Sequence, residues 1–140
     1  MVAKQLSVFI ENRQGRLGEV LKVLKNNNVN ILSLSLADTT EYGLLRLIVN
    51  APEIGKEELT KNGFSTMLTN VLIIKINHKA GSLQKLLEIL SEKNINIEYM
   101  YGLSTEGTEA TVVLKSSDLS LAEQTLSSFG IKTLSVEEIV

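Results

Sequence analysis

Residues 10–17 combine side chains and a backbone that suit the binding of a small polar molecule. The segment reads Ile-Glu-Asn-Arg-Gln-Gly-Arg-Leu. Gly15 can take a positive φ and lets a ligand approach the backbone closely. A helix that begins after this turn leaves backbone N–H groups unpaired, and these groups favour an anion such as a carboxylate. Asn12 can donate and accept hydrogen bonds, so its side chain suits the ammonium or carboxylate group of an amino acid.

A similar turn occurs later in the chain, at residues 76–83, and reads Ile-Asn-His-Lys-Ala-Gly-Ser-Leu. Gly81 repeats Gly15, whereas His78 takes the place of Asn12. The need for a sharp turn before a helix is enough to explain both glycines. We interpret His78 as a residue of a solvated or ligand-binding loop and not as a catalytic base, because the sequence identifies no partner for proton transfer.

Asn30 and Asn96 repeat at the same spacing, and each stands where the chain begins the second predicted strand of its unit. The fold described below is expected to place them close to the two turns. Ligand binding and hydrogen bonding to their own backbone are alternative explanations of both asparagines.

The whole chain repeats at this spacing. When residues 6–50 are placed above residues 72–116, ten positions carry the same residue without a gap. A period this long, with one apolar pattern per unit, indicates two copies of one supersecondary module. We therefore predict modules at 1–69 and 70–140. A lone unit of this size buries too little surface to be more than marginally stable, so the modules are expected to pack side by side.

Each unit shows strand and helix patterns in the order β-α-β-β-α-β. Residues 6–11 alternate with period two, as a half-buried strand does, and residues 17–24 carry one apolar helical stripe. Asparagines 26–28 are predicted to end that helix, because asparagine tolerates the left-handed conformation. The other predicted strands are 31–37, 44–49, 64–68, 71–76, 97–103, 111–115 and 131–136, and the other predicted helices are 53–62, 83–90 and a helix from the N-cap Asp118 to Phe129. This order predicts an α+β fold of two ferredoxin-like modules, with antiparallel sheets and the helices on one face.

Composition excludes several classes of function. The 14 basic and 16 acidic residues are well mixed and give a net charge of −2, and Phe9 is the one aromatic residue on the predicted middle strands of the first unit, so nucleic acid is not expected as a partner. The chain has no cysteine, which excludes disulfides, thiolate metal sites and a cysteine nucleophile. We expect no cofactor, no metal and no catalytic residue. No apolar run approaches the ~20 residues that span a bilayer, so we expect a cytoplasmic protein without a membrane partner.

The two turns and the segments before the second strands resemble the ACT domain, a small ligand-binding module of amino-acid-metabolism enzymes. The segments that carry the resemblance are Asn12-Arg13-Gln14-Gly15 with Leu17, Asn28-Val29-Asn30-Ile31, Lys79-Ala80-Gly81 with Leu83, and Lys93-Asn94-Ile95-Asn96-Ile97. The first turn most resembles the serine-binding domain of phosphoglycerate dehydrogenase, and this resemblance implies that Asn12 and Asn30 hold the ligand.

The resemblance also implies two half-sites for an amino acid, at a seam between modules or between chains. The implied residues are Asn12, Arg13, Gly15, Leu17, Asn30 and Ile31 in one half-site, and His78, Gly81, Leu83, Asn96 and Ile97 in the other. Because His78 replaces Asn12, the two half-sites need not bind the same ligand or bind it equally well.

The function implied by the resemblance is a stand-alone, non-enzymatic sensor of an amino acid that acts on a partner enzyme. Edge strands of the predicted sheets also invite homodimerisation. The alternative hypothesis is a regulatory or assembly subunit of a biosynthetic enzyme, similar to an acetolactate synthase small subunit, with vestigial ligand sites. A third hypothesis is a small enzyme.

Overall fold

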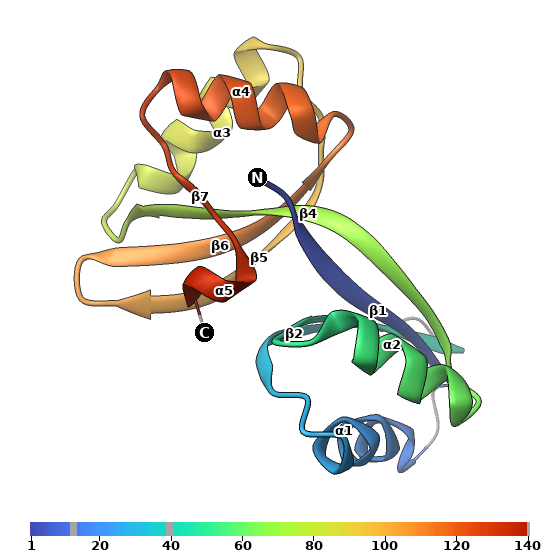
Figure 1. Ribbon diagram of the computed structural model, residues 1–140. Coiled ribbons are helices and arrows are strands. Elements are labelled where there is room, and N and C mark those ends of the chain that lie inside the picture. The colour runs from blue at the N-terminus through green and yellow to red at the C-terminus, as the bar shows by residue number, and fades with distance from the viewer. Residues whose placement is uncertain (12–13, 39–40, 140) are drawn as a thin grey trace. The chain divides into compact units, whose positions relative to one another are not determined.

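The computed structural model describes residues 1–11, 14–38 and 41–139, which form two compact units (Figure 1). The N-terminal module comprises Lys4–Thr69, and the C-terminal module comprises Asn70–Ile139 together with Met1–Ala3. Each module has the element order β-α-β-β-α-β, so the predicted α+β class and ferredoxin-like arrangement are confirmed.

The N-terminal module packs two helices against one face of its sheet (Figure 1). Its elements are β1 (Ala3–Glu11), α1 (Arg16–Asn26), β2 (Ile31–Asp38), β3 (Tyr42–Val49), α2 (Pro52–Lys61) and the first part of β4 (Ser65–Asn77). The strand order is β2-β3-β1-β4, so β2 lies at an edge of this module's sheet. Alternate residues of β1 face the helices, because Leu6, Val8 and Ile10 are buried in one cluster with Val20 and Leu24 of α1.

The C-terminal module repeats this arrangement. Its elements are the second part of β4, α3 (Ser82–Glu92), β5 (Ile97–Glu106), β6 (Glu109–Ser116), α4 (Leu119–Ser128), β7 (Thr133–Leu134) and α5 (Val136–Ile139). The strand β4 pairs with both β6 and β7, and β5 pairs with β6. Leu72 and Ile74 of β4 are buried with Leu86 and Leu90 of α3 and with Leu126 of α4. Asp118 caps α4 as predicted, since its Oδ1 accepts a hydrogen bond of 3.0 Å from the N–H of Leu121.

The structure corrects the register of the repeat. Leu6 of β1 pairs with Leu47 of β3. A gapless repeat would pair Leu72, the counterpart of Leu6, with Val113, but Leu72 of β4 pairs with Leu114 of β6. An irregularity in β5 at Leu103 takes up the extra residue. The gapless repeat expected from the sequence is wrong beyond this point, because a β-bulge adds one residue without changing the order of the strands.

The four helices α1 to α4 end in the same way. At the end of α1, the N–H of Val29 donates to the carbonyl of Leu24 at 2.9 Å, and the N–H of Asn28 donates to the carbonyl of Lys25 at 3.1 Å. This pair of bonds is a Schellman motif, which needs a left-handed residue at the position of Asn28. The residues in that position, with their φ angles, are Asn28 (56°), Gly63 (86°), Asn94 (56°) and Gly130 (74°). The predicted role of the asparagines at the end of α1 is confirmed, and the repetition of Asn94 has the same cause.

Three predicted elements differ from the structure. The strands predicted at 64–68 and 71–76 form one continuous strand, β4, because no proline or glycine interrupts the chain between them. The strand predicted at 131–136 is reduced to Thr133–Leu134. Phe129, predicted as the last residue of the helix that Asp118 caps, follows α4 and is 56% exposed.

A capping box stops the last strand early. The N–H of Ser135 donates to Oε1 of Glu138 at 3.0 Å, and the N–H of Glu138 donates to Oγ of Ser135 at 3.3 Å. These reciprocal bonds start the short helix α5. The backbone hydrogen bond from Ser135 holds the pKa of the Glu138 carboxyl below its ordinary value.

In the described part of the chain, no helix is long and apolar enough to cross a bilayer.

The left-handed conformation of Asn28 makes a stability prediction. Asn28→Gly should leave the free energy of unfolding nearly unchanged, because glycine adopts a positive φ without strain. Asn28→Ala should lower it by about 1 kcal/mol, because a Cβ without a local hydrogen bond disfavours this conformation. Urea unfolding measures both changes. Asn26→Ala, at the exposed end of α1, is the matched control and should have little effect. Equal stability of the two Asn28 variants would contradict the explanation.

Candidate functional site

Both turns place a glycine in the left-handed region directly before a helix. Gly15 has φ of 89° and is the N-cap of α1, and Gly81 has φ of 86° and is the N-cap of α3. A Cβ on either glycine would meet nothing within 4 Å, so the backbone angle and not crowding explains the residue type. Asn12 and Arg13, which the sequence assigns to the first turn, lie outside the described residues.

The first turns of α1 and α3 present backbone donors to their surroundings. Within the described residues, no side chain caps either helix at its N-terminus. Unpaired N–H groups at such a position carry a partial positive charge and suit a carboxylate. His78 is exposed beside Gly81, and its N–H donates to the carbonyl of Thr108 at 2.7 Å. Its imidazole therefore lies on an anchored turn rather than in the core.

Asn30 and Asn96 are held by their backbones. The N–H of Asn30 donates to Oδ1 of Asn50 at 2.8 Å, and the N–H of Asn50 returns a bond to the carbonyl of Asn30 at 3.1 Å. The carbonyl of Asn96 likewise accepts from the N–H of Ser117 at 3.0 Å. Both asparagines are exposed, and among the described residues neither side chain has a hydrogen-bond partner. The sequence did not identify Asn50 as the residue that anchors Asn30.

The expectation that each asparagine lies close to the turn of its own module is wrong. Gly15 precedes α1 and Asn30 follows it, so the two residues lie at opposite ends of this helix. The helix has 11 residues, and a rise of ~1.5 Å per residue separates its ends by about 16 Å. The same length of α3 separates Gly81 from Asn96. One module alone therefore cannot bring its turn and its asparagine to the same small ligand.

The apolar residues assigned to the two half-sites differ in exposure. Leu17 and Ile31 pack against the core of the N-terminal module, and Ile97 packs against the core of the C-terminal module. Leu83, the first residue of the helix predicted at 83–90, is 42% exposed. Leu17, Ile31 and Ile97 are partly buried and belong to the apolar layer beneath the protein surface. The side chain of Leu83 is exposed enough to contact a ligand directly.

The comparisons with known proteins agree with this geometry. A sequence profile described as an ACT domain pair matches residues 1–131. The chain belongs to the ACT domain pair family. Membership of this family points to a regulatory role that involves the sensing of amino acids. No curated protein matches the chain.

Solved structures share this fold over nearly the whole chain. Protein BT0572 from Bacteroides thetaiotaomicron is 36% identical with a TM-score of 0.94, and the match covers 99% of this chain and 96% of that chain. The regulatory subunit of aspartate kinase from Thermus thermophilus is 13% identical with a TM-score of 0.67, and the match covers 89% of this chain and 91% of that chain. The corresponding subunit from Thermus flavus is 14% identical with a TM-score of 0.65, and the match covers 97% of this chain and 91% of that chain. At these low identities, the two Thermus subunits show likeness of fold alone.

The two ACT modules differ beside the first turn of their first helix. In the N-terminal module, the Arg16 guanidinium lies over the Phe64 ring, with its central carbon 4.1 Å from the ring centroid. A nitrogen of the same guanidinium lies 2.6 Å from Oε2 of Glu19. In the C-terminal module, the corresponding region holds a pocket of about 470 Å³. The sequence signal was the unlike pair Arg16 and Ser82 within an otherwise similar turn, and sequence analysis did not use it.

The bonds at the start of β2 predict which asparagine stabilises the ACT fold. Asn50→Ala should lower the free energy of unfolding by about 1 kcal/mol, because the N–H of Asn30 loses its acceptor. Asn30→Ala should change it little, because that substitution keeps both backbone bonds. Urea unfolding of the two variants provides the comparison. A loss of stability in Asn30→Ala equal to that in Asn50→Ala would assign Asn30 a structural role.

Proposed function

We propose that this ACT domain pair is a sensor that binds a small amino acid and regulates a partner enzyme. The observation that carries the proposal is the duplicated, uncapped helix N-terminus behind a left-handed glycine, at Gly15 and at Gly81. Each offers backbone donors to a carboxylate, and no side chain in the described part of the chain caps them. The exposed side chains of Asn30 and Asn96 add neutral donors and acceptors for an ammonium group.

A homodimer would supply the two parts of one site. The strands β1 and β2 run parallel, because each is antiparallel to β3. The C-terminal end of β2 therefore lies at the same end of the sheet as the turn between β1 and α1. If the β2 edges of two chains pair antiparallel about a two-fold axis, Asn30 at the start of one β2 approaches the end of the partner's β2. Asn30 of one chain then faces the turn of the other, where Asn12, Arg13 and Gly15 belong.

The proposed site divides the recognition of an amino acid between these groups. The N-terminus of α1 and Arg13 would bind the carboxylate, while Asn12 and the other chain's Asn30 would bind the ammonium group. Leu17 and Ile31 would form the apolar surface beneath the ligand. In the C-terminal module, His78, Gly81, Leu83, Asn96 and Ile97 would form the counterpart, with selectivity altered by the imidazole. A ligand held between two chains favours the arrangement that it binds more tightly, which is how it would signal to a partner enzyme.

A thermal melt with a panel of amino acids tests this function, with L-serine first because the first turn resembles the serine-binding domain of phosphoglycerate dehydrogenase. A ligand at 100 times its dissociation constant should stabilise the protein by about 2.7 kcal/mol. For a chain of this length, that stabilisation raises the melting temperature by roughly 5–10 °C. Asn30→Ala should abolish the shift if the N-terminal site binds the ligand, and Asn96→Ala should abolish it if the C-terminal site does. Asn26→Ala should preserve the shift as a control.

Two outcomes would contradict the sensor. If no amino acid shifts the melt, the constitutive regulatory or assembly subunit with vestigial sites becomes the better hypothesis. If a ligand shifts the melt of both asparagine variants as much as that of the unaltered protein, the ligand binds elsewhere on the protein. Turnover of a substrate by the purified protein would instead support an enzyme.

The proposed dimer makes a separate prediction. Leu34 and Leu36 are 48% and 45% exposed on the edge strand β2. Substituting both with lysine should halve the mass measured by light scattering, because charged lysines on an edge strand oppose strand pairing. The same variant should lose the ligand shift of the N-terminal site. Ile54→Lys is the matched control, since Ile54 is 50% exposed on α2, away from this edge. An unchanged mass in the double variant would exclude dimerisation through β2.

A further inference from the structure

The pocket of the C-terminal module lies beside the N-terminal half of α3. It has a volume of about 470 Å³, within the range of sites that hold small molecules. The end of β4, α3 and the segment after α4 all contribute to its lining. None of His78, Gly81, Leu83, Asn96 or Ile97 lines it. The pocket nonetheless adjoins the half-site proposed for an amino acid, since Asn77, Lys79 and Ser82 belong to the same turn as His78 and Gly81.

In the N-terminal module, side chains of the protein itself fill the corresponding region. Ser82 and Ile131 line the pocket and correspond to Arg16 and Phe64 of the N-terminal module, once the extra residue in β5 is taken into account. There the guanidinium stacks on the aromatic ring and is paired with Glu19. The Arg16 side chain is only 14% exposed, so the protein fills its own cavity with a paired cation. In the C-terminal module, the shorter Ser82 leaves that volume open.

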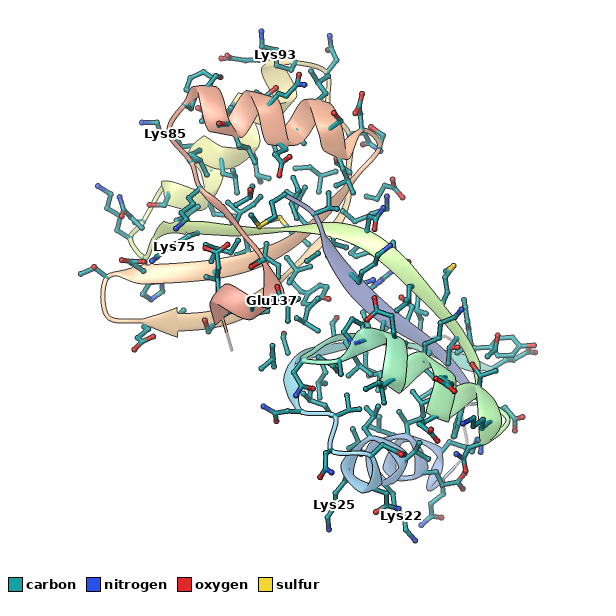
Figure 2. All side chains as sticks on the ribbon, viewed as in Figure 1. Lys22, Lys25, Lys75, Lys85, Lys93 and Glu137 are labelled. Carbon is teal, nitrogen blue, oxygen red and sulfur yellow. The ribbon has the colours of Figure 1, made fainter. Side chains whose placement is uncertain are left out.

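The charge of the region is reversed as well. Glu19 corresponds to Lys85, which lines the pocket together with Lys75 and Lys79. Lys75 is paired with Glu109. Among the described residues, Lys79 and Lys85 have no ion-pair partner. Figure 2 shows Lys75 and Lys85 on the C-terminal module, with Lys93 at the other end of α3. A region that binds its own cation in one module thus carries two unpaired cations in the other.

Apart from the charged residues, Asn77 and Ser82, the lining is apolar. Ile89 and Ile131 contribute to the wall, and Phe129, at the rim, is 56% exposed. An exposed aromatic ring directly after a helix has no packing role in the module core, and a planar or branched apolar group can stack on it. The pocket therefore presents an apolar surface next to unpaired positive charge.

We propose that this pocket binds a small organic anion, with its carboxylate, phosphate or sulfonate group at Lys79 and Lys85 and its apolar group against Phe129 and Ile131. The anion restores the charge balance that Glu19 provides in the N-terminal module. It also fills the volume that Arg16 fills there. The pocket and the C-terminal half-site share the turn between β4 and α3, so occupancy of one would affect the other.

The fluorescent probe 1-anilinonaphthalene-8-sulfonate tests the proposal, because it joins an anionic group to aromatic rings. N-Phenyl-1-naphthylamine, which has the same rings without the sulfonate, is the matched neutral probe. The folded full-length protein should bind the sulfonate at one site and at least tenfold more tightly than the neutral probe. Lys85→Gln and Lys79→Gln should each weaken the sulfonate about fivefold, as expected for a partly exposed charge pair. Lys93→Gln removes the same charge at the far end of α3 and should leave the affinity unchanged.

Filling the pocket provides a second test. The double variant Ser82→Arg with Ile131→Phe copies the arrangement of the N-terminal module and should abolish binding of the sulfonate while the thermal melt stays cooperative. Lys85→Glu copies the charge of Glu19 on an exposed helix position and should also abolish binding, so the test does not depend on the folding of the double variant. Equal affinity for the two probes, equal effects of Lys85→Gln and Lys93→Gln, or no binding of the sulfonate would each overturn the proposal.

Discussion

The arrangement of each module depends on burying one apolar stripe of its first helix against the sheet. Val20 and Leu24 satisfy this requirement in α1, and Leu86 and Leu90 satisfy it in α3. Both helices must run from the end of one strand to the start of the parallel strand, so their 11 residues set the distance between the glycine turn and the asparagine. In the proposed amino-acid site, this packing requirement of the core is the reason that the turn and the asparagine would come from different copies of the module.

The regular parts of the fold could be predicted because they follow from local chemistry. The stripe of α1, the N-cap Asp118 and the left-handed Asn28 each depend on residues within a few positions of one another. The bulge at Leu103 could not be predicted, because an extra residue in a strand leaves the alternation of its flanks intact. The early end of β7 depends on the bonds between Ser135 and Glu138, which compete with strand pairing only once the preceding chain is in place.

The candidate sites were less predictable, because they depend on pairs that are distant in the chain. Asn30 was identified by repetition, but the side chain that holds its backbone is Asn50, 20 residues away. This side-chain contact is not repeated in the C-terminal module, where the N–H of Ser117 donates to the carbonyl of Asn96. The pocket lies at positions where the two copies carry different residues, such as Ser82 in place of Arg16. Residues that are identical in the two copies therefore do not reveal it.

The duplication therefore gives two kinds of information. Identical residues such as Gly15 and Gly81 mark conformations that both modules need, whatever they bind. Unlike residues at equivalent positions mark places where one scaffold has been adapted differently. Arg16 fills this region of the N-terminal module with its own side chain, and its guanidinium stacks on Phe64 and pairs with Glu19. The C-terminal module keeps the same backbone around an open volume and places like charges at its margin. In the proposed anion site, a ligand at Lys79 and Lys85 would supply the negative charge that Glu19 supplies in the N-terminal module.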